Sequence, residues 1–263
     1  MVAKSNGVKA KKHLGQHFLE DPTVAERIAS AIQTIHAEAC ILEIGPGTGA
    51  LTRPLIQRFG PQVLALDLDD ESIRFLQQQD WVPAGSVQQG DFLRMSIADI
   101  AAGAPLVVAG NFPYNISSQI LFKFLDWKER GVELVGMFQK EVAERVCAPH
   151  GSKTYGILSV LIQVYYEAEY LFTVPPHVFN PPPKVHSGVL RLSRRPAWPS
   201  DVAYADLKRL TKAAFNQRRK TLRNSLRSGG FSIDRIDEAI LKLRPEQLSP
   251  NDFVELTRQI IRE

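Results

Sequence analysis

A short glycine-rich turn directly after a buried apolar segment constrains this chain more than any other feature. Residues 40–44 form the apolar segment and are expected to be a strand, and the turn after them is Gly45-Pro46-Gly47-Thr48-Gly49. Glycines let the backbone turn sharply and approach a ligand closely at the carboxyl end of a strand. The pattern therefore predicts an α/β fold with a nucleotide-like ligand beside its first strand.

Strand-like and helix-like segments alternate around this turn. Short apolar runs predict further strands at residues 63–66, 86–88, 106–109 and 132–138. Apolar residues at helical spacing predict helices at 50–59, 70–79 and 117–125, and one more helix is expected to begin after Asp21. Such alternation predicts a mostly parallel sheet with helices on both faces.

The rhythm changes after residue 155. A helix at 157–165 is followed by two strands, 168–173 and 186–192, which flank a proline-rich segment and are expected to form an antiparallel hairpin at the sheet edge. These strands bring the predicted sheet to seven. Beyond a proline-containing linker, helical patterns occupy 203–216, 218–226, 233–243 and 249–261. We therefore predict an α/β domain over residues 1–195 and a small all-α domain over residues 196–263.

The spacing of the glycines distinguishes two kinds of nucleotide cofactor. The dinucleotide fingerprint has its third glycine three residues after the second. Here Gly45, Gly47 and Gly49 alternate with other residues, and Glu43 precedes them. This spacing is typical of enzymes that use S-adenosylmethionine, which has no pyrophosphate group. Glu43 is then expected to interact with the amino-acid end of the cofactor, directly or through water.

Two further carboxylates follow strands and extend the predicted cofactor site. Asp67 ends the second strand, where a carboxylate can accept hydrogen bonds from both ribose hydroxyls. Asp91 follows the third strand and is placed to bind the adenine amine, with Phe92 as an apolar neighbour. Each residue alone could be a helix cap or a loop residue, but three such signals in order favour the cofactor site.

The fourth strand leads into Asn111-Phe112-Pro113-Tyr114, which we interpret as the catalytic motif. An exocyclic amine on a purine is a poor nucleophile because its lone pair is delocalised. The side-chain oxygen of Asn111 and the backbone carbonyl of Phe112, held by Pro113, are candidate acceptors for the two N–H bonds. Tyr114 is a candidate to stack on the base. The alternative is an ordinary proline-aromatic turn.

This chemistry requires an unpaired or flipped base, because the amine is inaccessible inside a helix. No general base is needed, so positioning is the main catalytic device. Phe179, within Phe-Asn-Pro-Pro-Pro-Lys, is a second aromatic candidate for the other side of the base. A proline-rich edge loop is the alternative for that segment, and both interpretations stay open.

Seven segments in order resemble the ribosomal RNA adenine dimethyltransferase family, and specifically its small-subunit members. They are residues 15–19, 43–49, 90–92, 111–118, 138–143, 179–187 and 214–222. The resemblance runs from about Lys12 to the C-terminus. It implies a Rossmann-like class I methyltransferase fold and S-adenosyl-L-methionine as the cofactor.

The resemblance also implies a reaction and a set of contacts. Members transfer two methyl groups onto N6 of each of two adjacent adenosines in a loop near the 3′ end of 16S rRNA, on a partly assembled small subunit. Position 17 is more often asparagine in the family, and position 112 more often leucine. By position, the cofactor contacts are His17, Leu19, Gly45, Asp67, Asp91 and Asn111.

Basic residues concentrate in one part of the chain, although the net charge is only +4. Residues 184–230 contain twelve Lys or Arg and two acids, a balance of 12 − 2 = +10. We predict that one helical stretch carries an RNA-binding stripe, with a solvated face as the alternative. The stripe residues are Arg218, Arg219, Lys220, Arg223 and Arg227. Residues 1–12 contain four lysines and are expected to form a flexible basic arm, either solvated or in contact with RNA.

Composition excludes several other classes of protein. Cys40 and Cys147 cannot form a disulfide framework, and no CxxC or histidine-rich tract predicts a metal site. We expect a reduced, cytoplasmic environment and a monomer. The longest apolar stretch, residues 157–164, is shorter than the roughly 20 residues of a membrane span.

Three alternative functions remain. A large-subunit rRNA adenine methyltransferase of the antibiotic-resistance type would share the catalytic domain and its chemistry. A non-catalytic ribosome-assembly factor could use the same scaffold, although an intact catalytic motif argues against it. A nicotinamide dehydrogenase is disfavoured because the glycine spacing is wrong and no hydride-handling pair is visible.

Overall fold

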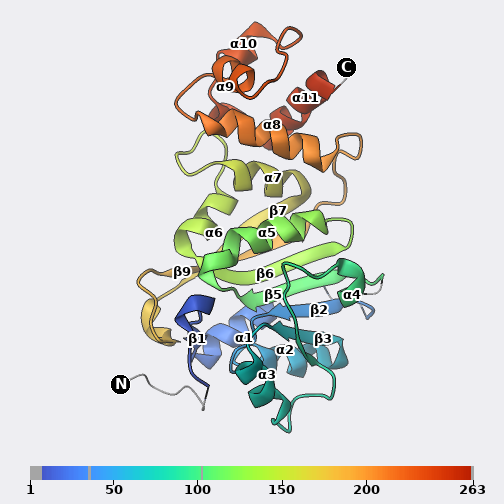
Figure 1. Ribbon diagram of the computed structural model, residues 1–263, viewed down its shortest axis with the longest axis vertical. Helices are drawn as coiled ribbons and strands as arrows, with labels where there is room; N and C mark the ends of the chain where they lie inside the picture. Colours follow the sequence, from blue (N-terminus) through green and yellow to red (C-terminus); the bar gives the residue numbers. More distant parts are fainter. Residues whose placement is uncertain (1–7, 35–36, 102, 262–263) are drawn as a thin grey trace. The chain divides into compact units, whose positions relative to one another are not determined.

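The computed structural model in Figure 1 describes residues 8–34, 37–101 and 103–261. The chain divides into two units, one of residues 1–143 with 169–194 and one of 144–168 with 195–263. The end of the first unit at residue 194 lies next to the predicted boundary at 195. Residues 144–168 differ from the prediction because they group with the C-terminal helices, where α7 (Ile157–Tyr165) packs on α8 (Tyr204–Asn216) and α11 (Pro250–Ile261).

The sheet has seven strands in the order β4-β3-β2-β5-β6-β9-β7. Strands β2 to β6 pair in parallel, and β9 runs antiparallel to β6. The prediction of a mostly parallel seven-stranded sheet is confirmed, with β9 inserted between β6 and the edge strand β7. The bounds are β2 Cys40–Ile44, β3 Val63–Asp67, β4 Val87–Gln89, β5 Leu106–Asn111, β6 Gly131–Gln139, β7 Tyr166–Val174 and β9 Ser187–Arg194.

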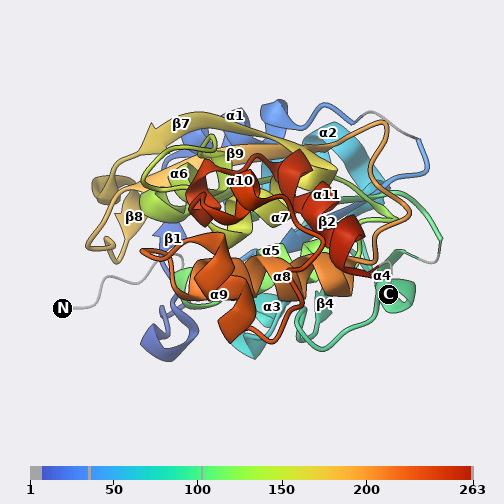
Figure 2. The ribbon, with the colours of Figure 1, turned by 90° about the horizontal axis from the view of Figure 1, so that it is seen from above.

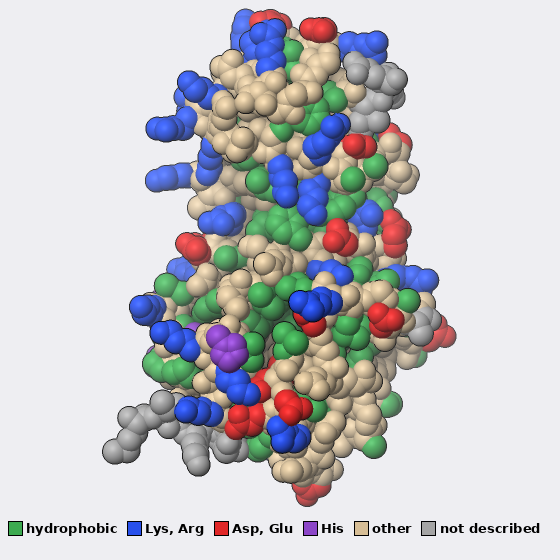
Figure 3. Space-filling model, viewed as in Figure 1, with side chains coloured by type: hydrophobic (Ala, Val, Ile, Leu, Met, Phe, Trp, Pro, Cys, Tyr) green, Lys and Arg blue, Asp and Glu red, His purple; other side chains and the backbone are tan. Residues whose placement is uncertain are grey.

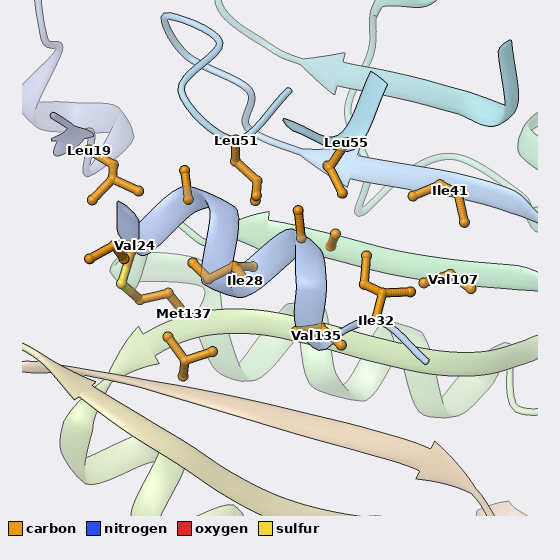
Figure 4. Close-up of a cluster of buried hydrophobic side chains, with 14 of the residues drawn as sticks. Leu19, Val24, Ile28, Ile32, Ile41, Leu51, Leu55, Val107, Val135 and Met137 are labelled. Atoms are coloured by element: carbon orange, nitrogen blue, oxygen red, sulfur yellow. The ribbon is translucent and has the colours of Figure 1, made fainter. Parts of the chain in front are cut away.

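Helices cover both faces of this sheet, with α1 and α2 on one side and α4 and α5 on the other in Figure 2. Asp21 begins α1 by accepting hydrogen bonds from the backbone N–H groups of Thr23 and Val24. Figure 4 shows the apolar face of α1, with Ile28, and the residue that follows the helix, Ile32, lying on the sheet. The bounds are α1 Pro22–Ala31, α2 Thr52–Phe59, α3 Asp70–Gln77, α4 Ile97–Ala101 and α5 Ser117–Asp126.

The N-terminal segment is packed onto the first unit from its first described residue. Val8 is only 2% exposed, and the ammonium of Lys11 forms an ion pair with Asp69. The prediction of a flexible arm is therefore wrong for residues 8–12, because apolar and ionic contacts hold them, while residues 1–7 lie outside the described residues. Further along, β1 (Phe18–Leu19) pairs antiparallel with β8 (Phe179–Asn180).

The second unit is helical, as its pattern predicts. The α11 helix begins at a reciprocal cap, in which Ser249 and Asp252 each accept a hydrogen bond from the other's backbone N–H. Two predicted helices are shorter than expected. The remaining bounds are α6 Lys140–Cys147, α9 Leu222–Ser228 and α10 Glu238–Leu241, with 3-10 turns η1 Lys12–Leu14, η2 Gly60–Gln62, η3 Tyr114–Ile116, η4 Pro176–Val178 and η5 Pro245–Gln247.

Both shortened helices begin later along the chain than predicted. The helix predicted at 233–243 begins only at residue 238, where the side chain of Asp237 caps the backbone N–H of Ala239. The helix predicted to begin at Arg218 begins at Leu222 instead, after an extended Thr221. Within the residues described, no helix is long and apolar enough to cross a membrane.

Candidate active site

One pocket of the first unit opens where β2, β3, β4 and β5 end. The strand order reverses between β2 and β5, and such switch points are where open α/β sheets bind ligands. The pocket brings together twelve of the predicted site residues, from five separate stretches of sequence. These are His17, Leu19, Glu43, Gly45, Gly47, Asp67, Asp91, Phe92, Asn111, Phe112, Pro113 and Tyr114.

Two predicted site residues do not line this pocket. Phe179 is 2% exposed and belongs to the hydrophobic core, because its backbone pairs with Leu19 and its ring points inward. The prediction that it faces the target base is therefore not met. Gly49 faces α3 instead, since a Cβ there would lie 2.7 Å from the Leu76 side chain.

The segment from Leu14 to Leu19 forms one wall of the pocket. Gly47 permits this close approach, because a Cβ on it would lie 2.9 Å from the Phe18 ring and its φ is +55°. Sequence patterns alone missed this wall, since a 3-10 turn and a two-residue strand leave no periodicity. Only the family resemblance, through His17 and Leu19, pointed to it.

Asp67 presents a buried and pre-oriented carboxylate. One oxygen accepts the Asp69 N–H at 2.9 Å, and the other accepts the Gly47 N–H at 3.3 Å. Burial raises the pKa of Asp67. The orientation of the Asp67 carboxylate is further fixed through Asp69, because the Asp69 side chain accepts hydrogen bonds from Lys11 and from the Gln16 amide. A carboxylate fixed in this way can accept hydrogen bonds from a diol.

Glu43 is the group in this pocket that most clearly lacks a partner. It is 1% exposed, and its Oε2 accepts no hydrogen bond from any residue that the structure describes. Burial raises its pKa to about 8; the neighbouring Thr52 hydroxyl opposes this rise and the charge of Asp67 adds to it. A buried carboxyl of this kind is suited to a cationic ligand, because an ammonium would satisfy it and restore its charge.

Asp91 and Phe92 line the pocket beside β4. One Asp91 oxygen accepts the Leu93 N–H at 3.0 Å, and the other lies 3.2 Å from Nε of Arg94. Each carboxylate oxygen has a second lone pair and can still accept a bond from a ligand amine. Phe92 packs edge-on against Trp127, at 5.0 Å between ring centroids, and offers an apolar surface.

The orientation of the Asn111 amide follows from one contact. Its Nδ2 donates to the backbone carbonyl of His17 at 2.9 Å. A carbonyl can only accept, so the amide nitrogen must face it. Oδ1 accepts no hydrogen bond from the residues that the structure describes, and Asn111 itself lines the pocket. The His17 ring is itself held, because Nδ1 donates to the Pro181 carbonyl at 2.7 Å.

The family model for ribosomal RNA adenine dimethylase matches residues 7–256 of this chain. The chain belongs to the ribosomal RNA adenine dimethylase family. This confirms the prediction of an S-adenosylmethionine-dependent rRNA adenine dimethyltransferase, with the fold that the resemblance implied.

Two curated relatives carry the name Ribosomal RNA small subunit methyltransferase A. The protein from Porphyromonas gingivalis is 49% identical over 254 residues, covering 95% of this chain and 97% of the relative. The protein from Cytophaga hutchinsonii is 48% identical over 253 residues, covering 96% and 98%.

Two solved structures show the same fold. A dimethyladenosine transferase from Plasmodium falciparum has a TM-score of 0.74 at 24% identity, covering 92% of this chain and 98% of its own. The 23S rRNA methyltransferase ErmE has a TM-score of 0.70 at 23% identity, covering 92% and 99%. At such identities the likeness bears on the fold alone.

This member of the family has phenylalanine at position 112, and its ring occupies space that is open only because neighbouring residues of the sheet are glycines. Phe112 is 1% exposed and packs on Phe138 at 4.8 Å between centroids. A Cβ on Gly136 would lie 2.1 Å from the Phe112 ring. The backbone of Phe112 is held as well, because its N–H donates to the Met137 carbonyl. These contacts determine where its own carbonyl points.

Gly136→Ala should therefore damage both stability and catalysis. Overpacking a core of this kind costs about 1–3 kcal/mol, and displacement of the Phe112 ring also moves its carbonyl. Thermal melts and steady-state methylation would measure the two effects. Phe112→Leu should partly restore both in the double variant. Gly156→Ala is the control, since a Cβ there meets nothing within 4 Å, and it should melt like the wild type.

The predicted RNA-binding residues lie in the second unit, but not on one helix. Arg218, Arg219 and Lys220 are exposed in the turn between α8 and α9, while Arg223 and Arg227 are on α9. The prediction of a continuous helical stripe is wrong, because α9 begins only at Leu222. Arg223 is also paired with Glu238. Figure 3 shows Lys and Arg side chains gathered over α8 and α9.

Proposed function

We propose that this chain dimethylates N6 of two adjacent adenosines in a loop near the 3′ end of 16S rRNA. The observation that carries the proposal is the Asn111 amide, whose nitrogen is held by the His17 carbonyl so that its oxygen stays available in a pocket lined by buried carboxylates. The small-subunit substrate is supported by relatives of 47–49% identity that carry a small-subunit name. The enzyme acts in the cytoplasm, as a monomer, on a partly assembled subunit.

The residues present fit S-adenosyl-L-methionine. The Glu43 Oε2, which has no partner among the described residues, suits its ammonium group, the Asp67 carboxylate suits its ribose hydroxyls, and Asp91 with Phe92 suits its adenine. His17, Leu19, Gly45 and Gly47 border the same space. When bound, the cofactor supplies an electrophilic methyl group on a sulfonium.

The chain's own part in the reaction is to hold one amine. Asn111 Oδ1 and the Phe112 carbonyl accept hydrogen bonds from the two N–H groups of the adenine amine, which favours a pyramidal nitrogen with a more localised lone pair. Tyr114 lines the same pocket and stacks on the unpaired base. No side chain needs to remove a proton before the nitrogen reacts, so correct placement supplies most of the rate enhancement.

The turn between α8 and α9 contacts rRNA phosphates. Its cations Arg218, Arg219 and Lys220 are exposed, and the surrounding region carries the excess of positive charge. Replacing all three with alanine should weaken binding to the small subunit and lower the slope of log affinity against log salt by about 2. Filter binding across salt concentrations measures this slope. An unchanged slope would contradict the assignment, and Arg74→Ala in the first unit is the control.

Purified ribosomal subunits from cells that lack this enzyme test the proposed function. Incubation with the protein and radiolabelled cofactor should yield N6,N6-dimethyladenosine in 16S rRNA of the small subunit, measured by mass spectrometry of nucleosides. Label in 23S rRNA of the large subunit instead would support the antibiotic-resistance type of enzyme. No label in either would leave a non-catalytic assembly factor as the better account.

A further inference from the structure

The Tyr114 side chain extends across the carboxyl end of β6 and contacts a residue on the other side of that strand. Tyr114 follows β5, Ser187 begins β9, and β6 lies between these two strands in the sheet. The phenol oxygen of Tyr114 lies 2.5 Å from Oγ of Ser187. Since Ser187 pairs with Gln139, the last residue of β6, the Tyr114 ring spans the carboxyl end of that strand.

Ser187 has the properties of an anchor and not of a substrate contact. It is fully buried, it is absent from the pocket lining, and its backbone is held in the pairing of β9 with β6. Within the described part of the chain, its hydroxyl has no hydrogen-bond partner except Tyr114. A buried hydroxyl without a partner is destabilising, so this one bond satisfies both groups.

The contact restricts the plane of the Tyr114 ring. A tyrosine held only at its backbone can rotate about χ1 and χ2, whereas one held at its hydroxyl as well has little freedom. The His17 ring limits it further, at 5.6 Å between centroids and 31° between planes. Both neighbours belong to segments distant in sequence, so the orientation of the ring depends on the folded site.

We propose that Ser187 is a positioning residue for methyl transfer, because its bond to the Tyr114 hydroxyl sets the plane on which the target adenine stacks. The inference rests on the proposed function, in which Tyr114 contacts the base. A tilted ring would tilt the base and lengthen the bonds from its amine to Asn111 and Phe112. The second transfer should be the more sensitive, since the nitrogen already carries one methyl group and is more crowded.

Four proteins test this inference: wild type, Ser187→Ala, Tyr114→Phe and the double variant. Each single change removes the same bond and should lower kcat about 3- to 10-fold, the effect of one net hydrogen bond, with the KM for the cofactor unchanged. The double variant should be no slower than the slower single variant. The ratio of N6-methyladenosine to N6,N6-dimethyladenosine should rise in all three variants.

Ser86→Ala is the matched control, since Ser86 is also buried but lies at the opposite end of the sheet, before β4. It should leave kcat and the product ratio unchanged. The inference would be overturned if Ser187→Ala had the kcat and the product ratio of the wild type. It would also be overturned if the losses of kcat in the two single variants multiplied in the double variant. Absence of methylation by the wild-type protein would overturn the proposed function together with this inference.

Discussion

Asn111→Ala should lower the rate of methyl transfer by at least about 100-fold, the loss seen when one aligned polar group is removed from a preorganised site. The change removes the acceptor Oδ1 and the donor that binds the His17 carbonyl. Single-turnover methylation of small subunits at saturating cofactor measures the chemical step directly.

Asn111→Asp separates the two roles of this side chain. It keeps an acceptor oxygen but sets a carboxylate against the His17 carbonyl, so it should retain more activity than alanine and less than the wild type. Melting curves for both variants show whether a loss of activity comes from a loss of the fold. If Asn111→Ala kept more than a tenth of the wild-type rate, the amide could not be the main acceptor for the amine.

Glu43→Gln should have opposite effects on stability and on cofactor binding. Burial raises the pKa of Glu43 from 4.5 to about 8, so the folded protein retains a proton that the unfolded chain releases. The contribution of Glu43 to the free energy of unfolding is therefore highest below pH 4.5, where the carboxyl is protonated in both states. It falls as the pH rises and is lost once the pH has passed about 8. Glutamine stays neutral, so the cofactor-free variant should melt higher than the wild type at pH 8 and lose this pH dependence.

The same variant should bind the cofactor about 10- to 150-fold more weakly, because a hydrogen bond to a charged partner is lost. Calorimetric titration gives the affinity, and melts from pH 5 to 9 give the stability profile. Glu246→Gln is the control, since it too has a buried Oε2 without a partner but lies in the second unit. If Glu43→Gln bound the cofactor as tightly as the wild type, the assignment of Glu43 to the cofactor site would be wrong.

The part of the site that the sequence predicts best is the part made by strand ends. Glu43, Asp67, Asp91 and Asn111 lie at or just beyond the carboxyl ends of neighbouring parallel strands, and topology alone then brings them to one edge. Their bonding was not predictable. The free oxygen of Asn111 depends on the His17 carbonyl, which comes from a segment 94 residues away.

Phe179 and the basic turn show why the surroundings of other residues could not be predicted from the sequence. Whether the Phe179 ring turns inward depends on the pairing of β8 with β1, which no local pattern encodes. Arg218, Arg219 and Lys220 have helix-favouring side chains, yet they lie in a turn. The reason is tertiary, since the backbone N–H of Leu222 donates to the Leu243 carbonyl and α9 begins there.

The pairing of β1 with β8 also affects when the enzyme becomes competent during its synthesis. Phe18 and Leu19 leave the ribosome before their partners, because Asn180 and Phe179 are made about 160 residues later. Until then the wall that orients Asn111 lacks its second strand. We therefore expect the wall beside Asn111 to be complete only after residues 179 and 180 have been synthesised.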